Sequence, residues 1–305
     1  MATGIVLFPA PQAVNVVDDL IAQAERAYAL GVRQVWLPQQ FDYDAIALAG
    51  LLGAVVPGLG VGTLVVPFNP RHPLIMAQMA QTAQAASHGN FSLGVGLGSR
   101  EPERLAFGAS WPNTVDRLRE HLTVLRSIIE TGAVDFTGEQ ISSSPAWPVK
   151  LSGGTPLPVY VAAMGPKALR VTGELADGTL PYLAGPRTIA EFIEPTVAKA
   201  AAEAGRPKPK IIAAVPVLVS DDVDTARAFA IQRLSFYETI PSYQKVIARE
   251  GLASTADLAA IGPAESIRRQ LQRYLDAGAT DVVLSPLDRQ DVVAAEGIWA
   301  VAASL

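Results

Sequence analysis

One stretch decides the fold: VYVAAMGPKALRVTGELADGTLPY, residues 159–182. Val159–Ala163 is a short apolar run, which predicts a buried strand. Pro166–Ala176 has the pattern of a helix, with proline at its first position. An Asp-Gly turn then leads into a second predicted strand, Thr179–Tyr182. A strand, a helix and another strand in succession predict a βαβ unit and a parallel sheet.

The same alternation continues on both sides of this stretch. Eight short apolar runs are each followed by a helical stretch, which is the count of an α/β (β/α)8 TIM barrel. The predicted strands cover residues 3–8, 34–37, 60–66, 91–96, 159–163, 179–182, 211–219 and 281–285. We expect a single domain over residues 1–305, with insertions near 99–112, 134–157 and 222–260. A doubly wound sheet is the alternative, but both glycine-rich runs, 58–62 and 94–98, lack the third glycine of G-x-G-x-x-G.

Composition excludes several classes of protein. The 305 residues include no cysteine and three histidines, which argues against thiolate metal sites, disulfide scaffolds and cysteine nucleophiles. The net charge is −5 and no basic cluster is present, which argues against a nucleic-acid partner. Half of the residues are apolar, which is incompatible with disorder.

No charged residue lies between Asp44 and Arg71, a length that could cross a bilayer. Several glycines and prolines interrupt this stretch, so a buried helix, a turn and a buried strand explain it better. The N-terminal residues MATGIVLFPAP have no basic region before their apolar run, unlike a signal peptide. We therefore expect a cytoplasmic protein without a membrane partner.

Active sites of barrel enzymes lie at the carboxyl ends of the strands. In this chain those positions carry mostly apolar residues, amides and glycines, without a carboxylate pair, a Ser-His-Asp set or a metal cluster. Such a lining suits a large planar cofactor that supplies the chemistry itself. Gly165 and Pro166 begin a helix whose free N–H groups could bind an anion, or form an ordinary turn. Gln39 and Gln40 could donate hydrogen bonds to a ring carbonyl, or belong to a solvated turn.

Other polar residues predict structural roles. His72 stands at a helix start, where we expect a structural contact rather than a catalytic base. His88 and His121 are expected on a helix surface or in the core. The side chains of Asp116, Arg117, Arg119 and Glu120 are expected to form a solvated helix face, and residues 99–112 to form a polar loop.

The motifs together resemble the bacterial luciferase-like family, and within it the branch that uses the deazaflavin coenzyme F420. The matching stretches are VWLP (35–38), GTLVVP (62–67) with RHP (71–73), GNFSLGVGLG (89–98), RLREH (117–121), PVYVAAMGP (158–166) and ADG (176–178). They come in the family's order and cover most of the chain.

The resemblance implies that the cofactor ring lies over the strand ends of a barrel that forms a homodimer. It implies a non-prolyl cis peptide near Thr63–Leu64 that backs the ring, and backbone contacts to the cofactor's phosphate tail. The residues that would hold the cofactor are Gln39, Thr63, Leu64, Gly98, Met164, Gly165, Lys167, Ala168 and Tyr182.

Two departures from the family pattern bear on the reaction. Relatives that oxidise glucose 6-phosphate carry Asp-His where this chain has Gln39-Gln40, and Glu where it has Ser99. Neutral amides cannot act as general bases at neutral pH. Gln40 and Ser99 are the candidate catalytic positions, and we expect reduced coenzyme F420 to reduce an imine, an enone or a similar small-molecule acceptor. The alternatives are an FMN-dependent monooxygenase that uses O2 and a non-catalytic cofactor-binding barrel.

Overall fold

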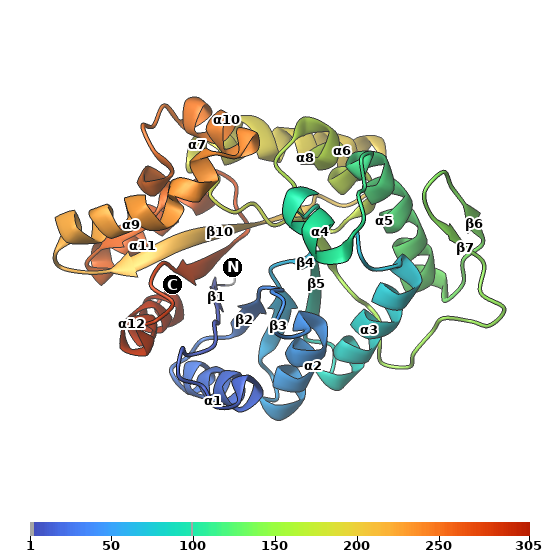
Figure 1. Ribbon diagram of the computed structural model, residues 1–305, viewed down its shortest axis with the longest axis horizontal. Coiled ribbons are helices and arrows are strands. Elements are labelled where there is room, and N and C mark those ends of the chain that lie inside the picture. The colour runs from blue at the N-terminus through green and yellow to red at the C-terminus, as the bar shows by residue number, and fades with distance from the viewer. Residues whose placement is uncertain (1–2, 99) are drawn as a thin grey trace. The chain divides into compact units, whose positions relative to one another are not determined.

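The computed structural model describes residues 3–98 and 100–305, without the side chains of residues 100–103 and 292–293. The chain forms two compact units, each built from separate stretches (Figure 1). Unit 1 contains the chain up to Trp36 together with Leu180–Thr196 and Lys210–Leu305. Unit 2 contains Leu37–Thr179 and Val197–Pro209.

The strands of unit 1 are parallel and lie in the order β11–β10–β12–β1–β2. They are β1 (Thr3–Val6), β2 (Gln34–Leu37), β10 (Lys210–Val219), β11 (Ala260–Gly262) and β12 (Asp281–Pro286). Ile5 lies opposite Leu284 on one side and Val35 on the other, and all three are fully buried. Such continuous apolar runs are typical of parallel strands that are covered on both faces.

Helices alternate with the strands of unit 1. They are α1 (Val16–Ala29), α7 (Pro186–Thr188), the π-helix Ile189–Ile193, α8 (Glu194–Glu203, which continues into unit 2), α9 (Val223–Glu238), α10 (Pro241–Glu250), the 3-10 helix Thr255–Leu258, α11 (Ala264–Asp276) and α12 (Val292–Ala303). The predicted helix breaks at Pro241 and Gly251 are confirmed, since α10 begins at the first and ends before the second. The short strand β11 was not predicted, because three residues carry no readable alternation.

Unit 2 contains a second set of parallel strands, in the order β3–β5–β8–β9, with β4 paired to β5. Their bounds are β3 (Gly60–Thr63), β4 (Val66–Pro67), β5 (Phe91–Gly96), β8 (Val159–Ala162) and β9 (Gly178–Thr179). The predicted strand 60–66 is therefore divided in two. The insertion near 134–157 contains a small antiparallel hairpin, β6 (Phe136–Thr137) with β7 (Ser142–Ser143).

The helices of unit 2 are α2 (Ala45–Val55), α3 (Pro73–Ala86), α4 (Arg100–Phe107), α5 (Thr114–Thr131) and α6 (Pro166–Leu175). Helices α2 and α3 lie side by side (Figure 1), and a Cβ atom at Gly50 would come within 2.9 Å of the Ala83 Cα atom. The uncharged stretch thus forms a helix, a turn and strand β3, as predicted. No helix in the described parts of the chain has the length and apolar character needed to cross a bilayer.

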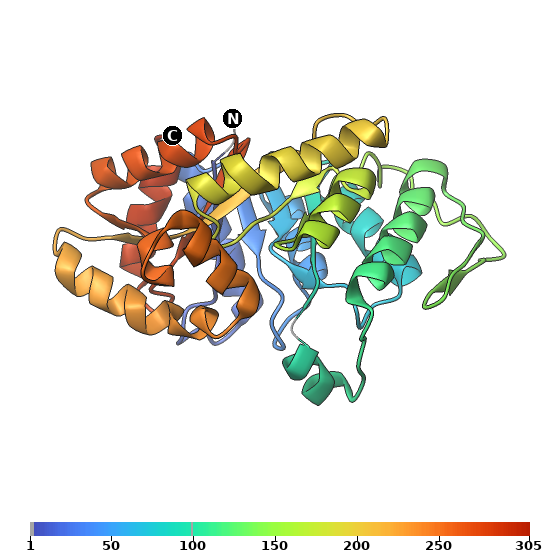
Figure 2. The ribbon, with the colours of Figure 1, turned by 90° about the horizontal axis from the view of Figure 1, so that it is seen from above.

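Two predictions about the helices and strands were wrong. Residues 99–112 are not simply a polar loop, because α4 lies within them and projects from the rest of unit 2 (Figure 2). Its charged residues hid the helix, since they leave little apolar periodicity. The strand predicted at Thr179–Tyr182 ends early, and Tyr182 forms only a single bridge with Ala214. Pro181, just before Tyr182, has no N–H group to donate to a neighbouring strand.

Candidate functional site

The carboxyl ends of β3, β4, β5 and β8 come together at one edge of unit 2, because these strands are parallel. The loop after Leu37 joins this edge through two backbone hydrogen bonds: Leu64 N donates to Leu37 O (2.8 Å), and Gln39 N donates to Val65 O (3.4 Å). Most of the residues singled out from the sequence lie along this edge, which we call the strand-end edge.

The non-prolyl cis peptide is present, but one bond later than predicted. It joins Leu64 to Val65 and lies between β3 and β4, whereas the resemblance placed it near Thr63–Leu64. Leu64 and Val65 are both half-buried, so part of each side chain stays accessible. A Cβ atom at Gly96 would collide with Val65 Cγ2, so the glycine allows this bulge to lie against β5.

Thr63 has a structural position. Its side chain is fully buried, and its hydroxyl donates to Gly94 O (2.8 Å) and accepts from Gly94 N (2.9 Å). The hydroxyl therefore joins β3 to β5 in place of a ladder hydrogen bond, inside the sheet rather than on its accessible edge.

The amide of Gln39 is engaged within its own loop. Its Nε2 donates to Gln40 O (2.7 Å) and Tyr43 O (2.5 Å), and its Oε1 accepts from Ala45 N (3.0 Å) and Arg71 Nη2 (3.2 Å). These four contacts shape the loop and leave Gln39 little capacity for a ligand. The side chain of Gln40 is exposed, so of this pair it is the one placed to meet a ligand.

Sequence reasoning missed the ion pair that holds this loop. Arg71 Nη2 lies 2.8 Å from Asp44 Oδ2, and both side chains are largely shielded from solvent. The other oxygen of Asp44 caps α2 by accepting from Ile46 N and Ala47 N. Arg71 belongs to the RHP motif, which the sequence indicated only as a helix start.

Arg117 and Glu120 do not lie on a solvated helix face, contrary to prediction. Arg117 Nη2 donates to Asn69 O (3.1 Å), and Asn69 Nδ2 donates to Leu97 O (3.1 Å), so the guanidinium reaches the ends of β4 and β5. Burial lowers the pKa of Arg117, an effect that the nearby Glu120 carboxylate opposes. Glu120 accepts hydrogen bonds from three backbone N–H groups of the hairpin insertion, at residues 139–141.

The start of α6 has the features of an anion site. Gly165 is its N-cap and Pro166 its first residue, and no side chain among the described residues caps it. A Cβ atom at Gly165 would meet no atom within 4 Å, so the space in front of the helix is open. Lys167 is exposed, whereas Met164 is half-buried and Ala168 buried. Free N–H groups, the helix dipole and a lysine together favour a negatively charged ligand.

Gly98 is exposed at the end of β5 and has a positive φ of 71°, a conformation that favours glycine. Its backbone is therefore available for close approach. Ser99, the second candidate catalytic position, lies outside the described residues.

Tyr182 lies in unit 1. Its ring packs against Tyr237 at 5.4 Å between centroids, and Tyr237 packs against Tyr243 at 5.1 Å. Burial raises the pKa of Tyr182 and of Tyr243, so both phenols stay protonated. The cluster joins the end of the sixth predicted strand to α9 and α10.

Unit 1 has a second helix start with the sequence Gly-Pro, at Gly185-Pro186. Here the carboxylate of Glu250 accepts hydrogen bonds from Arg187 N (3.3 Å) and Thr188 N (2.5 Å). A Cβ atom at Gly185 would lie 2.5 Å from Glu250 Oε2. This helix start is occupied by the protein's own carboxylate.

The histidines have structural positions. His72 caps α3 by accepting from Leu74 N (3.2 Å), as predicted. His121 is fully buried, against the ring of Phe68 and 3.4 Å from Met76 Sδ. Burial is the main cause that lowers the pKa of His121 to about 3, with smaller contributions from the Arg117 and His72 charges. Within the described residues, no group of three His, Cys, Asp or Glu could hold a metal ion.

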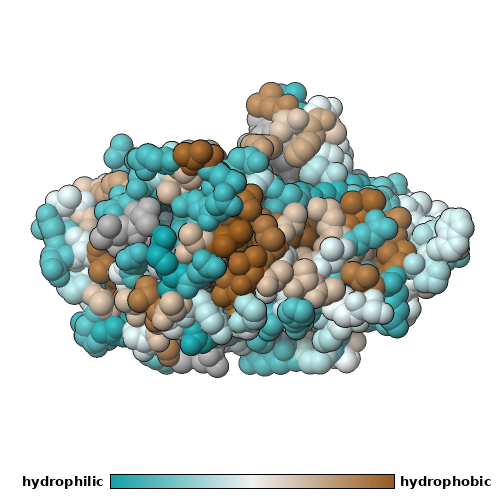
Figure 3. Space-filling view, turned by 90° about the horizontal axis from the view of Figure 1, so that it is seen from below, coloured by the Kyte–Doolittle hydropathy of each residue, from teal (hydrophilic) through white to brown (hydrophobic). Residues whose placement is uncertain are grey.

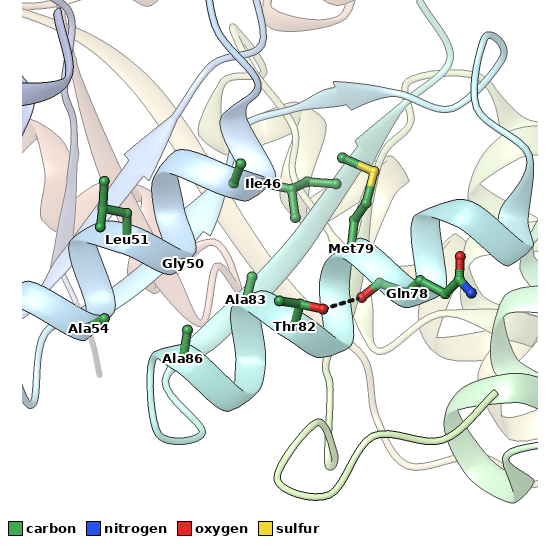
Figure 4. Close-up of a pocket in the computed structure, with 10 residues that line it drawn as sticks. Ile46, Gly50, Leu51, Ala54, Gln78, Met79, Thr82, Ala83 and Ala86 are labelled. Carbon is green, nitrogen blue, oxygen red and sulfur yellow. Dashed lines mark hydrogen bonds between the residues drawn. The ribbon is translucent and has the colours of Figure 1, made fainter.

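An apolar groove of about 520 Å³ lies between α2 and α3 (Figure 4). Ala47, Gly50, Ala54, Ala83 and Ala86 line it together with larger apolar residues, and its polar side chains are Gln78 and Thr82. It lies on the helical flank of unit 2 and lacks charged groups, so it does not offer the chemistry of an active site.

Comparison with known proteins identifies relatives by sequence and solved structures with a similar fold. The chain is 30% identical over 239 residues to a phthiodiolone/phenolphthiodiolone dimycocerosates ketoreductase of Mycobacterium tuberculosis. That match covers 72% of this chain and 61% of the relative, so the chain spans less than two thirds of the length of this relative.

Solved structures show the fold. An F420-dependent secondary alcohol dehydrogenase in complex with an F420-acetone adduct superposes with a TM-score of 0.79 at 23% identity, covering 100% of this chain and 98% of that one. The oxygenating constituent of 3,6-diketocamphane monooxygenase from Pseudomonas putida, in complex with FMN, has a TM-score of 0.75 at 15% identity, covering 99% and 96%. The predicted (β/α)8 TIM barrel is thereby confirmed. The sequence profile described as luciferase-like monooxygenase matches residues 1–284, and this chain belongs to that family.

Proposed function

We propose that this chain is an oxidoreductase that uses reduced coenzyme F420 to reduce a carbonyl, imine or enone substrate. The observation that carries the proposal is the open start of α6, where Gly165, Lys167 and uncapped N–H groups fit the anionic tail of a cofactor. The ketoreductase relative and the F420-dependent secondary alcohol dehydrogenase, which shares the fold, support the same proposal.

Different described residues would bind the phosphate and the ring of the cofactor. When bound, the deazaflavin supplies the hydride. The first turn of α6 and Lys167 would hold the phosphate, and Leu64 and Val65 would offer a partly accessible apolar surface to the ring. The exposed amide of Gln40 would be free to donate a hydrogen bond to a ring carbonyl.

The proposed direction is reduction, in which the coenzyme would give a hydride to the carbonyl or imine carbon and solvent water would give the proton. Oxidation of an alcohol requires a base that accepts the hydroxyl proton. The amides of Gln39 and Gln40 cannot accept it at neutral pH. An FMN-dependent monooxygenase is the second candidate, because an FMN complex shares the fold.

The test is a titration of the purified chain with reduced coenzyme F420, oxidised coenzyme F420 and FMN, each followed by fluorescence. We expect micromolar binding of the deazaflavin. Binding of FMN without the deazaflavin would replace the leading proposal with the monooxygenase.

The variant Gly165→Ala sharpens the titration. The added methyl group meets no protein atom within 4 Å and the backbone φ is −97°, so folding should be unchanged. The methyl group enters the space in front of the helix, and we expect roughly tenfold weaker coenzyme binding, about 1.4 kcal/mol. Gly297→Ala, in α12, is the matched control, since its Cβ would make only ordinary contacts with Val219 at 3.9–4.0 Å. If Gly165→Ala and the control bind the coenzyme with equal affinity, the start of α6 does not hold its phosphate.

A further inference from the structure

Unit 2 carries large apolar side chains that are exposed beside the strand-end edge. Phe41 is 80% exposed and Phe107 is 47% exposed. Together with the half-buried Trp111 they form what we call the apolar run. Large exposed apolar residues that lie together mark binding surfaces more often than isolated ones do.

The apolar run combines two segments that are far apart in the chain, and its three rings contact one another in turn. The rings of Phe41 and Phe107 are 6.4 Å apart between centroids, and those of Phe107 and Trp111 are 6.3 Å apart. Figure 2 shows α4 standing out from unit 2, and in Figure 3 the same projection, at the top of the view, carries apolar atoms. The run is thus a continuous surface that connects the loop after β2 to α4 and the segment behind it.

The inner end of the run is fixed to the candidate site. The guanidinium of Arg117 lies over the Trp111 ring, 5.9 Å from its centroid, and the same group donates to Asn69 O at the end of β4. Phe41 directly follows Gln40, and α4 begins two residues after Gly98. Both segments of the run therefore leave the strand-end edge at positions proposed to meet the cofactor.

This placement distinguishes the run from the other apolar surface of unit 2. The groove between α2 and α3 lies on the flank, where an active site is not expected, whereas the run continues from the carboxyl ends of the strands. A surface that continues outward from a reaction site is suited to the part of a substrate that does not react.

We propose that the apolar run binds an extended apolar chain of the substrate, so that the substrate class is carbonyl or imine compounds with a long alkyl or aryl substituent. The proposal rests on the proposed function for the reacting group. Burial of one methylene group against such a surface strengthens binding roughly fourfold when it is complete, and roughly twofold when half of the group stays in water.

The test uses straight-chain 2-alkanones, from 2-pentanone to 2-undecanone, titrated calorimetrically into the full chain, alone and saturated with oxidised coenzyme F420. We expect the dissociation constant to fall roughly two- to fourfold for each added methylene. The double variant Phe41→Ser with Phe107→Ser should abolish this dependence, because it removes the two most exposed residues of the run. Trp147→Ser is the control, since Trp147 is also 80% exposed in unit 2 but lies in the insertion before β8.

Thermal unfolding verifies that the variants fold, as expected for exposed positions. The proposal is overturned if the wild type shows no chain-length dependence in either state, or if the double variant keeps the wild-type dependence. It is also overturned if the double variant changes only the sedimentation of the chain, since the run would then be a self-association surface. Chain-length dependence in a protein that binds no coenzyme F420 would uphold the apolar run and overturn the proposed cofactor.

Discussion

Replacing Thr63 with valine tests whether this residue holds strands or a cofactor. The two side chains have nearly the same shape, so the variant removes a hydroxyl without opening a large cavity. In the structure that hydroxyl contacts both Gly94 N and Gly94 O within a fully buried environment. The variant therefore leaves a donor and an acceptor of β5 without this partner.

The expected loss of stability follows from these two groups. An unsatisfied buried polar group costs about 1–3 kcal/mol, so the variant should lose about 2–6 kcal/mol. Total unfolding free energies are about 5–15 kcal/mol, so the change is large. For a chain of this size we expect the midpoint of thermal unfolding to fall by several degrees, at about 2 °C for each kcal/mol. Thr63→Ser, which keeps the hydroxyl and loses one methyl group, should lose only about 1 kcal/mol.

Thermal and urea unfolding of the three proteins give the answer. The structural assignment fails if Thr63→Val is as stable as the wild type, or if Thr63→Ser is the less stable of the two variants. Coenzyme titration adds a second criterion. Folded Thr63→Val should bind the coenzyme with wild-type affinity. Weaker coenzyme binding at unchanged stability would mean that Thr63 contacts the cofactor.

Two further predictions concern buried or bridging charges. The folded pKa of His121, about 3, is below its unfolded value of 6.5, so the unfolded state takes up the proton first and stability falls as the pH drops below about 6.5. Urea unfolding at pH 4 should show a loss of about 3 kcal/mol relative to pH 7 from this residue, absent in His121→Leu; an equal pH slope in both proteins would contradict it. Glu250→Ala should speed amide hydrogen exchange at Arg187 and Thr188, with Glu250→Gln intermediate, because the carboxylate accepts from both. Unchanged exchange would mean that this contact does not protect the helix start.

Strand and helix order could be predicted because the apolar periodicity of most elements is strong. Strand Phe91–Gly96 and the start of α6 at Pro166 have the predicted bounds. Helix α4 and strand β11 were missed for opposite reasons: the first is too charged to show an apolar face, and the second is too short to show alternation.

The sequence predicted which segments form the site, but not which hydrogen-bond partners its side chains have. The open helix start at Gly165 follows from local sequence, since Gly-Pro fixes the turn and the first helical residue. The engagement of Gln39 and Thr63 depends on Arg71 and Gly94, which are distant in sequence, and no local pattern reports such partners. Arg117 was misassigned for the same reason, because its acceptor lies on another element.

The two Gly-Pro helix starts also have a consequence for how binding is directed. Their local sequences are alike, yet the Glu250 carboxylate accepts backbone hydrogen bonds at one of them, whereas no side chain among the described residues caps the other. An anion arriving from solution would have to compete with a tethered carboxylate at Gly185 and with water alone at Gly165. If the proposed function holds, Glu250 would keep an anionic cofactor tail away from the Gly185 helix start without contacting it. Position 250 is therefore the first residue to compare in a relative that binds its ligand elsewhere.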